Sequence, residues 1–150
     1  MIKNVFYIAA LTLLLSCGKS PACSGDNENK GDVAATYEGY DCPDLMFSEH
    51  IDQQYVIRSE DDISSSGLDS CLITTVDFDS YTLLGYPLGA SGCSQKFIRD
   101  VSIDDEAKTV HYLVTVKECG SCLPWVVSPN FVLIPKIPDD YDVTFESKHK

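Results

Sequence analysis

The clearest pattern in the chain is a period of two in the apolar side chains of two segments joined by an acidic stretch. The alternation places seven side chains on one face: Phe97, Val101, Ile103, Val110, Tyr112, Val114 and Val116. A period of two predicts strands with one buried face, so we expect a β-hairpin that turns at residues 104–106. Pairing Ile103 with Val110 brings Val101 opposite Tyr112. The same register brings Phe97 opposite Val116.

Shorter patterns predict the rest of the secondary structure. Tyr55–Ile57 and Tyr81–Leu84 are apolar or β-branched runs typical of short strands. Ser59 followed by Asp62 resembles a capping box, which predicts a short helix that ends at Ser64–Gly67.

A further strand is expected over Asn130–Ile137. Pro135 and Pro138 have no N–H to donate, so this strand should lie at a sheet edge or end there. With one short helix expected, the chain is predicted to be all-β with minor α. We expect a single small antiparallel β-sandwich or partly open barrel that contains disulfides.

The N-terminus has the pattern of an export signal. A short segment with one lysine precedes the uncharged, mostly apolar run Val5–Leu15, which is too short to cross a membrane as a helix. The run ends at Leu14-Leu15-Ser16-Cys17, which resembles the lipobox of bacterial lipoproteins. Residues 1–16 are therefore predicted to be a lipoprotein signal peptide, and the Cys17 thiol the site of lipid attachment. The alternative is an ordinary secretory signal cleaved after Ala22.

The predicted organisation after the signal has two parts. Residues 17–36 are rich in Gly, Ser, Asn, Asp and Lys, so we expect a lipidated N-terminus followed by a flexible tether. Residues 37–150 should form the β domain. Several acyl chains on Cys17 would anchor the protein stably in a membrane. Gly18 is not the aspartate that often retains lipoproteins in the inner membrane, which favours the outer membrane as the location in the cell envelope.

Charge excludes one class of partner. The net charge is −12, and it becomes −13 when the predicted signal peptide, with one lysine and no acidic residue, is removed. Nucleic-acid binding requires Lys and Arg to neutralise phosphates, so we expect no nucleic-acid partner.

Cysteines predict disulfides. Besides Cys17 the chain has Cys23, Cys42, Cys71, Cys93, Cys119 and Cys122, an even set in an exported protein. Extending the hairpin register places Cys93 beside Gly120 with Cys122 as its diagonal neighbour, so we expect a Cys93–Cys122 bond. A single bulge would bring Cys119 there instead. A zinc site usually has two close ligand pairs, and the sequence has one, so neither a metal site nor a cofactor is expected.

Two enzymatic alternatives remain open. Cys119-Gly120-Ser121-Cys122 has the spacing of a thiol-disulfide site, although no periodic helix follows it, as the thioredoxin type requires. A hydrolase could use acidic clusters at residues 60–62, 104–106 and 139–142, two of them in predicted turns and the first at the predicted helix start. A serine hydrolase is not expected, because no G-x-S-x-G pattern accompanies the three histidines, His50, His111 and His149.

Two aromatic residues are candidates for partner contact. Trp125 and Phe131 flank a short segment close to the cysteine-rich turns. Such side chains can form an exposed contact for a partner, or they can belong to the core.

The order of several motifs resembles the protease-complex-associated polypeptide (PrcB) family of small exported β domains. The motifs are Tyr55–Ser59 before the helix, Val76–Phe78, the glycine-rich turn Gly89–Gly92, the hairpin, Val132–Lys136 and Val143–Glu146. The chain departs from the family where Gly92 leads into Cys93-Ser94 rather than an aromatic residue. The resemblance implies an accessory role beside a surface protease, and it assigns no catalytic residue. We therefore expect a non-enzymatic binding or accessory module anchored to a membrane through Cys17, with a protein such as a protease as its partner.

Overall fold

The computed structural model describes residues 23, 25–41, 50–72 and 74–150, of which 49% are in strands and 7% are helical. Its elements, in chain order, are β1 Glu28–Gly31, β2 Ala35–Thr36, β3 Tyr55–Ile57, α1 Glu60–Ser66, β4 Tyr81–Gly85, β5 Leu88–Ser91, β6 Ser94–Asp104, β7 Thr109–Cys119, β8 Trp125–Ser128, β9 Val132–Pro135 and β10 Asp142–His149. Cys17 and the predicted signal peptide lie outside the described residues, as does Cys42.

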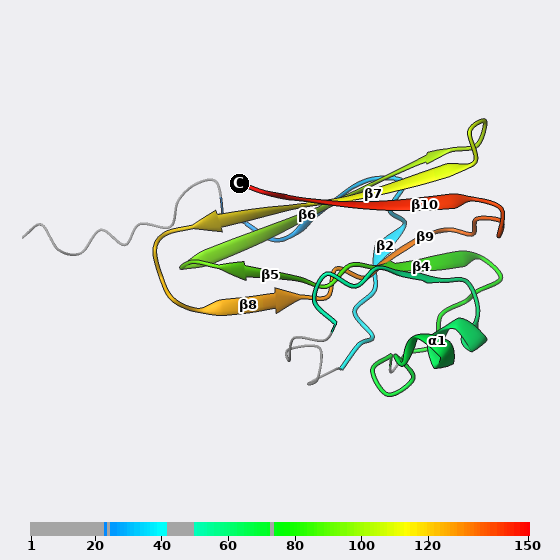
Figure 1. The fold of residues 1–150 in the computed structure, drawn as a ribbon, viewed down its shortest axis with the longest axis horizontal. Coiled ribbons are helices and arrows are strands. Elements are labelled where there is room, and N and C mark those ends of the chain that lie inside the picture. The colour runs from blue at the N-terminus through cyan, green and yellow to red at the C-terminus, as the bar shows by residue number, and fades with distance from the viewer. Residues whose placement is uncertain (1–22, 24, 42–49, 73) are drawn as a thin grey trace, which may run out of the picture.

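The first sheet has the order β1-β6-β7-β10, and its centre is the long hairpin of β6 and β7 (Figure 1). The hairpin has the predicted register, with Ile103 opposite Val110 and Phe97 opposite Val116. Alternation of side chains fixes this register, because a slip of one residue would turn the apolar face toward water.

The second sheet has the order β2-β9-β4-β3, with antiparallel pairs throughout. The strand predicted over residues 130–137 is β9, and it ends at Pro135 as expected from a residue without an N–H. Apolar side chains of β4 alternate between the two faces of this sheet. Leu84 packs toward the first sheet and Leu83 packs toward the helix side.

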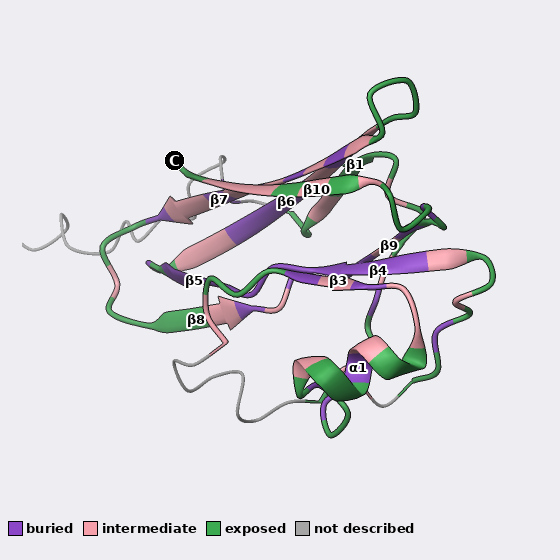
Figure 2. Cartoon of the chain, turned by 45° about the vertical axis from the view of Figure 1, so that its right-hand side comes forward, coloured by how far each residue is buried: buried purple, intermediate pink, exposed green. Residues whose placement is uncertain are grey.

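The core therefore has two parts, one on each face of the second sheet. Between the sheets, the apolar face of the hairpin packs against residues of β4 and β9 such as Val132 and Ile134. On the other face, Ile63 of α1 packs with Ile57 and Phe131. Figure 2 shows α1 on the side of β3 and β4 that faces away from the first sheet. The predicted all-β sandwich with one short helix is thus confirmed.

The cap of α1 is also as predicted. The Ser59 hydroxyl accepts a hydrogen bond from the backbone N–H of Asp62, and the Asp62 carboxylate accepts one from the N–H of Arg58. Gly67 ends the helix with a left-handed backbone, φ 74°.

A two-stranded sheet of β5 and β8 lies beneath one end of the hairpin (Figure 1). The chain enters β6 from β5 and leaves β7 toward β8, so both strands reverse at the end of the hairpin that carries the cysteines. Ser91, the last residue of β5, pairs with Trp125, the first residue of β8, next to this reversal. The resemblance implies a glycine-rich turn at Gly89–Gly92, but residues 89–91 belong to strand β5, and of this turn Gly92 alone lies between β5 and β6.

Two features differ from the expectations. Residues 28–31 and 35–36, predicted to be flexible tether, are strands β1 and β2, so the folded part begins before Tyr37. In addition, β1 pairs with β6 and β10 pairs with β7 in parallel, so the edges of the first sheet are not antiparallel. Both edges are filled by segments distant in sequence, which local patterns do not reveal.

Candidate functional site

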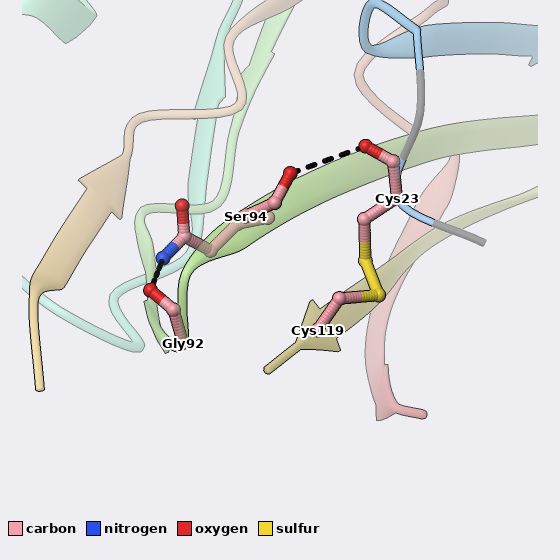
Figure 3. Close-up of a disulfide and its surroundings, with 5 residues drawn as sticks. Cys23, Gly92, Ser94 and Cys119 are labelled. Atoms are coloured by element: carbon pink, nitrogen blue, oxygen red, sulfur yellow. Dashed lines mark hydrogen bonds between the residues drawn. A yellow bond between two sulfur atoms is a disulfide. The ribbon is translucent and has the colours of Figure 1, made fainter. Parts of the chain in front are cut away.

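Two disulfides fasten the cysteine end of the hairpin. The predicted Cys93–Cys122 bond is present, with a Cα–Cα distance of 4.7 Å. A second bond joins Cys23 to Cys119 across 6.1 Å between Cα atoms, and the Ser94 hydroxyl donates to the Cys23 carbonyl at 3.2 Å (Figure 3). Cys71 is disulfide-bonded as well. The prediction of structural disulfides is confirmed for these five cysteines.

The close approach of the two turns depends on a residue without a side chain. Gly120 has φ 78°, and a Cβ atom there would lie 2.6 Å from the Cys93 sulfur. The Cys93 N–H donates to the Cys119 carbonyl at 2.8 Å, which continues the hairpin ladder by one bond. The turns are therefore held by covalent bonds and backbone hydrogen bonds together.

This connectivity bears on the thiol-disulfide alternative. Cys119 and Cys122 are bonded to different partners, Cys23 and Cys93, rather than to one another. A thioredoxin-type cycle needs the two cysteines of the motif to form the exchanging disulfide. The geometry of the described cysteines fits a structural role.

Three large apolar side chains follow the disulfide turn and are exposed. Leu123, Trp125 and Val126 have exposed fractions of 98%, 59% and 39%, and together they are called the apolar patch below. The Trp125 indole lies directly on the backbone of β5, because a Cβ atom at Gly89 would be 1.9 Å from its Cζ2 atom. Of the two alternatives left open for Trp125, an exposed contact or a place in the core, the structure shows exposure.

Phe131 takes the other alternative and belongs to the core, so it is not available for partner contact. Its side chain is 1% exposed and packs with the rings of Tyr37 and Tyr55 in the helix-side core. Gly85 provides the space, since a Cβ atom there would be 2.0 Å from Phe131 Cε1.

A pocket of about 410 Å³ lies next to the apolar patch, and Val126 contributes to its wall. Rings of Tyr37, Tyr40, Phe97 and Phe131 supply apolar walls. Polar side chains, among them Glu38 and Gln95, make up much of the rest of its lining. The volume of the pocket lies in the range of small-ligand sites.

The buried charged group of this pocket is Arg99. It occupies an inward-facing position of β6 between Phe97 and Val101, and it is 6% exposed. Arg99 Nε donates to the side-chain oxygen of Asn130 at 3.1 Å. Arg99 Nη2 lies 3.5 Å from the Ser128 hydroxyl. Desolvation by burial lowers the pKa of the guanidinium from its ordinary value, yet arginine remains charged in proteins.

Asn130 organises this end of the pocket. Its backbone is left-handed, φ 47°, and its side-chain nitrogen donates to the carbonyls of Tyr86 and Ser128 at 3.1 Å each. Its own carbonyl accepts a 2.6 Å hydrogen bond from the Tyr112 hydroxyl. Burial raises the pKa of that hydroxyl far above its ordinary value, so it stays protonated and donates.

The three histidines are dispersed. His50 Nδ1 contacts the Tyr55 hydroxyl at 2.7 Å, His111 pairs with Glu146 at 3.2 Å and His149 lies 3.7 Å from Glu118. No hydrogen bond joins any of them to a serine hydroxyl within the part of the chain that the structure describes.

The acidic clusters have structural contacts. The cluster at 60–62 begins α1, where acidic groups favour the helix N-terminus. The clusters at 104–106 and 139–142 come together, with the Tyr141 hydroxyl donating to Asp105 at 2.8 Å and Lys108 pairing with Asp140. These contacts fasten the far turn of the hairpin to the start of β10.

Among residues 23, 25–41, 50–72 and 74–150, no helix is long and apolar enough to span a membrane. Within the same ranges no group of three or more potential metal ligands is present.

Arg99 was not identified from the sequence, although a signal exists. It shares the parity of the apolar face of the hairpin, where a charged residue interrupts the pattern.

Comparisons with known family models, with curated proteins and with solved structures give no match to this chain.

Proposed function

We propose that this protein is a lipoprotein of the cell envelope, anchored through Cys17, whose β domain is a non-enzymatic accessory module that binds a protein partner. The leader that ends at Cys17 supports the anchor, and the outer membrane is the proposed location. The disulfides support export, because such bonds persist in oxidising compartments and are rare in the cytosol.

The Cys23–Cys119 bond supports a position close to the membrane. Only the five residues from Gly18 to Ala22 separate the proposed anchor from this cross-link. The six residue-to-residue steps from Cys17 to Cys23 span at most roughly 20 Å when the chain is extended. The cysteine end of the hairpin, and with it the apolar patch, would therefore lie near the membrane surface.

The observation that carries the proposal is the exposed apolar patch. Leu123, Trp125 and Val126 are consecutive or nearly so, and the Cys93–Cys122 bond and the contact of Trp125 with Gly89 hold them in place. Exposed apolar side chains gathered at one place mark interaction sites, and tryptophan is enriched among residues that dominate binding energy.

The proposed partner is a protein located at the membrane, with a surface protease as the first to test. The net charge of the chain disfavours insertion of the patch into an anionic lipid surface. Because the segment from Cys17 to Cys23 is short, the patch would lie close to the membrane surface, where a membrane-located partner could contact it.

Site-specific photo-crosslinking in intact envelopes tests this proposal. A photoreactive residue in place of Val126 should give one discrete protein adduct, because Val126 lies in the patch. Adding Trp125→Ser should abolish the adduct while circular dichroism shows an unchanged fold. The matched control places the photoreactive residue at Glu106, in the exposed far turn of the hairpin, and should give no such adduct.

Three outcomes would contradict the proposal. These are adducts to lipid alone at position 126, an equal protein adduct from position 106, or an adduct that Trp125→Ser leaves unchanged. The identified partner is then purified, and its affinity for the Trp125→Ser variant should fall at least about tenfold, a typical effect of removing a dominant interface residue.

A further inference from the structure

Arg99 is a buried cation without an anionic partner in the described part of the chain. Its side chain is 6% exposed, and its hydrogen-bond acceptors are neutral oxygens of Asn130 and Ser128. By contrast Lys96, which is also buried, contacts Glu28 Oε1 at 2.6 Å. A buried charge is costly unless it is paired, so the position of Arg99 calls for an anion.

The guanidinium is held in a fixed orientation that leaves donors free. Asn130 accepts from Nε, and the Ser128 hydroxyl lies beside Nη2 and itself donates to Asn130 at 2.9 Å. The Nη1 group donates to no described residue. A positioned guanidinium with open N–H groups can bind a planar carboxylate through two parallel hydrogen bonds.

The pocket around Arg99 selects among anions. Its walls include the rings of Tyr40 and Phe97, which favour an apolar or aromatic body on the ligand. Glu38 also lines the pocket and is exposed. A second negative charge on the ligand would meet this carboxylate, so a monoanion fits better than a dianion such as phosphate.

We infer that Arg99 binds the carboxylate of a monoanionic ligand whose apolar body fills this pocket. The ligand is a free aromatic or aliphatic acid, or the C-terminal carboxylate of a peptide with an apolar last residue. This binding site shares Val126 with the apolar patch, but the carboxylate contact at Arg99 requires neither the lipid anchor nor the protein partner proposed above.

Calorimetric titration of the full chain tests the inference with matched acids and amides. N-acetylphenylalanine should bind at least about tenfold more tightly than its neutral amide, because only the acid has a carboxylate for the guanidinium. Phenylacetate, which has no peptide group, distinguishes the two ligand sources. Binding equal to that of N-acetylphenylalanine indicates a free acid, and much weaker binding indicates a peptide C-terminus. Inorganic phosphate should bind more weakly than either preferred acid.

Variants locate the binding. Arg99→Met removes the charge at similar length and should reduce the affinity for the preferred acid at least about tenfold. Arg58→Met is the matched control, since Arg58 lies elsewhere and interacts with Asp139 and the Tyr141 carbonyl. That variant should bind the acid as the wild type does.

The inference is overturned if the acid and the amide bind equally, if no acid binds at millimolar concentration, or if Arg99→Met leaves the affinity unchanged. If Arg99→Met fails to fold, the affinities of the acid and the amide for the wild-type protein still test the inference. A failure here leaves the adduct at position 126 unaffected, so the two proposals are tested separately.

Discussion

The two disulfides allow a stability prediction whose size follows from their sequence separations. Cys23 and Cys119 are 96 residues apart, and Cys93 and Cys122 are 29 apart. In the chain-entropy description, a cross-link stabilises by restricting the unfolded chain, and the effect grows with the logarithm of the loop length. The estimate is about 4.7 kcal/mol for the longer loop and about 3.6 kcal/mol for the shorter one.

The perturbation is the paired substitution of each bridge by serine, Cys23→Ser with Cys119→Ser and Cys93→Ser with Cys122→Ser. We expect both to lower the free energy of unfolding by several kcal/mol, the first by about 1 kcal/mol more than the second. The order should hold because both bridges lie at the same end of the hairpin and share its surroundings.

Urea unfolding followed by circular dichroism measures both free energies, with slopes compared to verify a two-state transition. Peptide mapping of the unreduced wild type first establishes that the bonds are Cys23–Cys119 and Cys93–Cys122. A larger loss from removing the shorter loop, or a loss under about 1 kcal/mol from either, would refute the reasoning from loop length.

Two further substitutions test particular contacts. Gly89→Ala should displace the Trp125 indole, because the new Cβ would be 1.9 Å from its Cζ2 atom. A shift in the fluorescence emission of the single tryptophan measures this displacement. Unchanged emission would contradict the contact. Glu28→Gln tests the ion pair with Lys96. The hydrogen bond and the charge of Lys96 lower the pKa of Glu28 below 4.5, so its stabilisation is present above that pH and is lost as pH falls through the folded value. The difference in unfolding free energy between wild type and variant should therefore be constant near pH 7 and shrink below pH 4.5, whereas a difference that grows on acidification would contradict the pairing.

Much of the fold was predictable because it depends on local patterns. The hairpin register follows from a period of two on both strands, and the Cys93–Cys122 bond follows from extending it. The start of α1 follows from Ser59 and Asp62, since a cap involves residues only a few positions apart.

What the sequence did not reveal depends on contacts between distant segments. β1 has a polar sequence without alternation, and it forms because the edge of β6 and the Lys96–Glu28 pair hold it. In the sequence, Trp125 and Phe131 are equivalent candidates for an exposed contact. Phe131 is buried because Gly85, in another strand, leaves the space that its ring occupies.

The candidate pocket was hidden for the same reason. Arg99 interrupts the hairpin pattern, but its surroundings depend on Ser128 at the end of β8 and on Asn130 in the connection to β9, which are distant from it in the sequence. A charged residue on an apolar face can equally be paired inside the protein, and only the tertiary structure distinguishes these cases.

The central claim is that a lipid-anchored module presents its cysteine end close to a membrane. Intact mass spectrometry of the protein extracted from native envelopes tests it most directly. We predict a chain that begins at Cys17 and has the added mass of acyl groups. A chain that retains residues 1–16, or one that begins at another residue without acyl mass, would contradict the account.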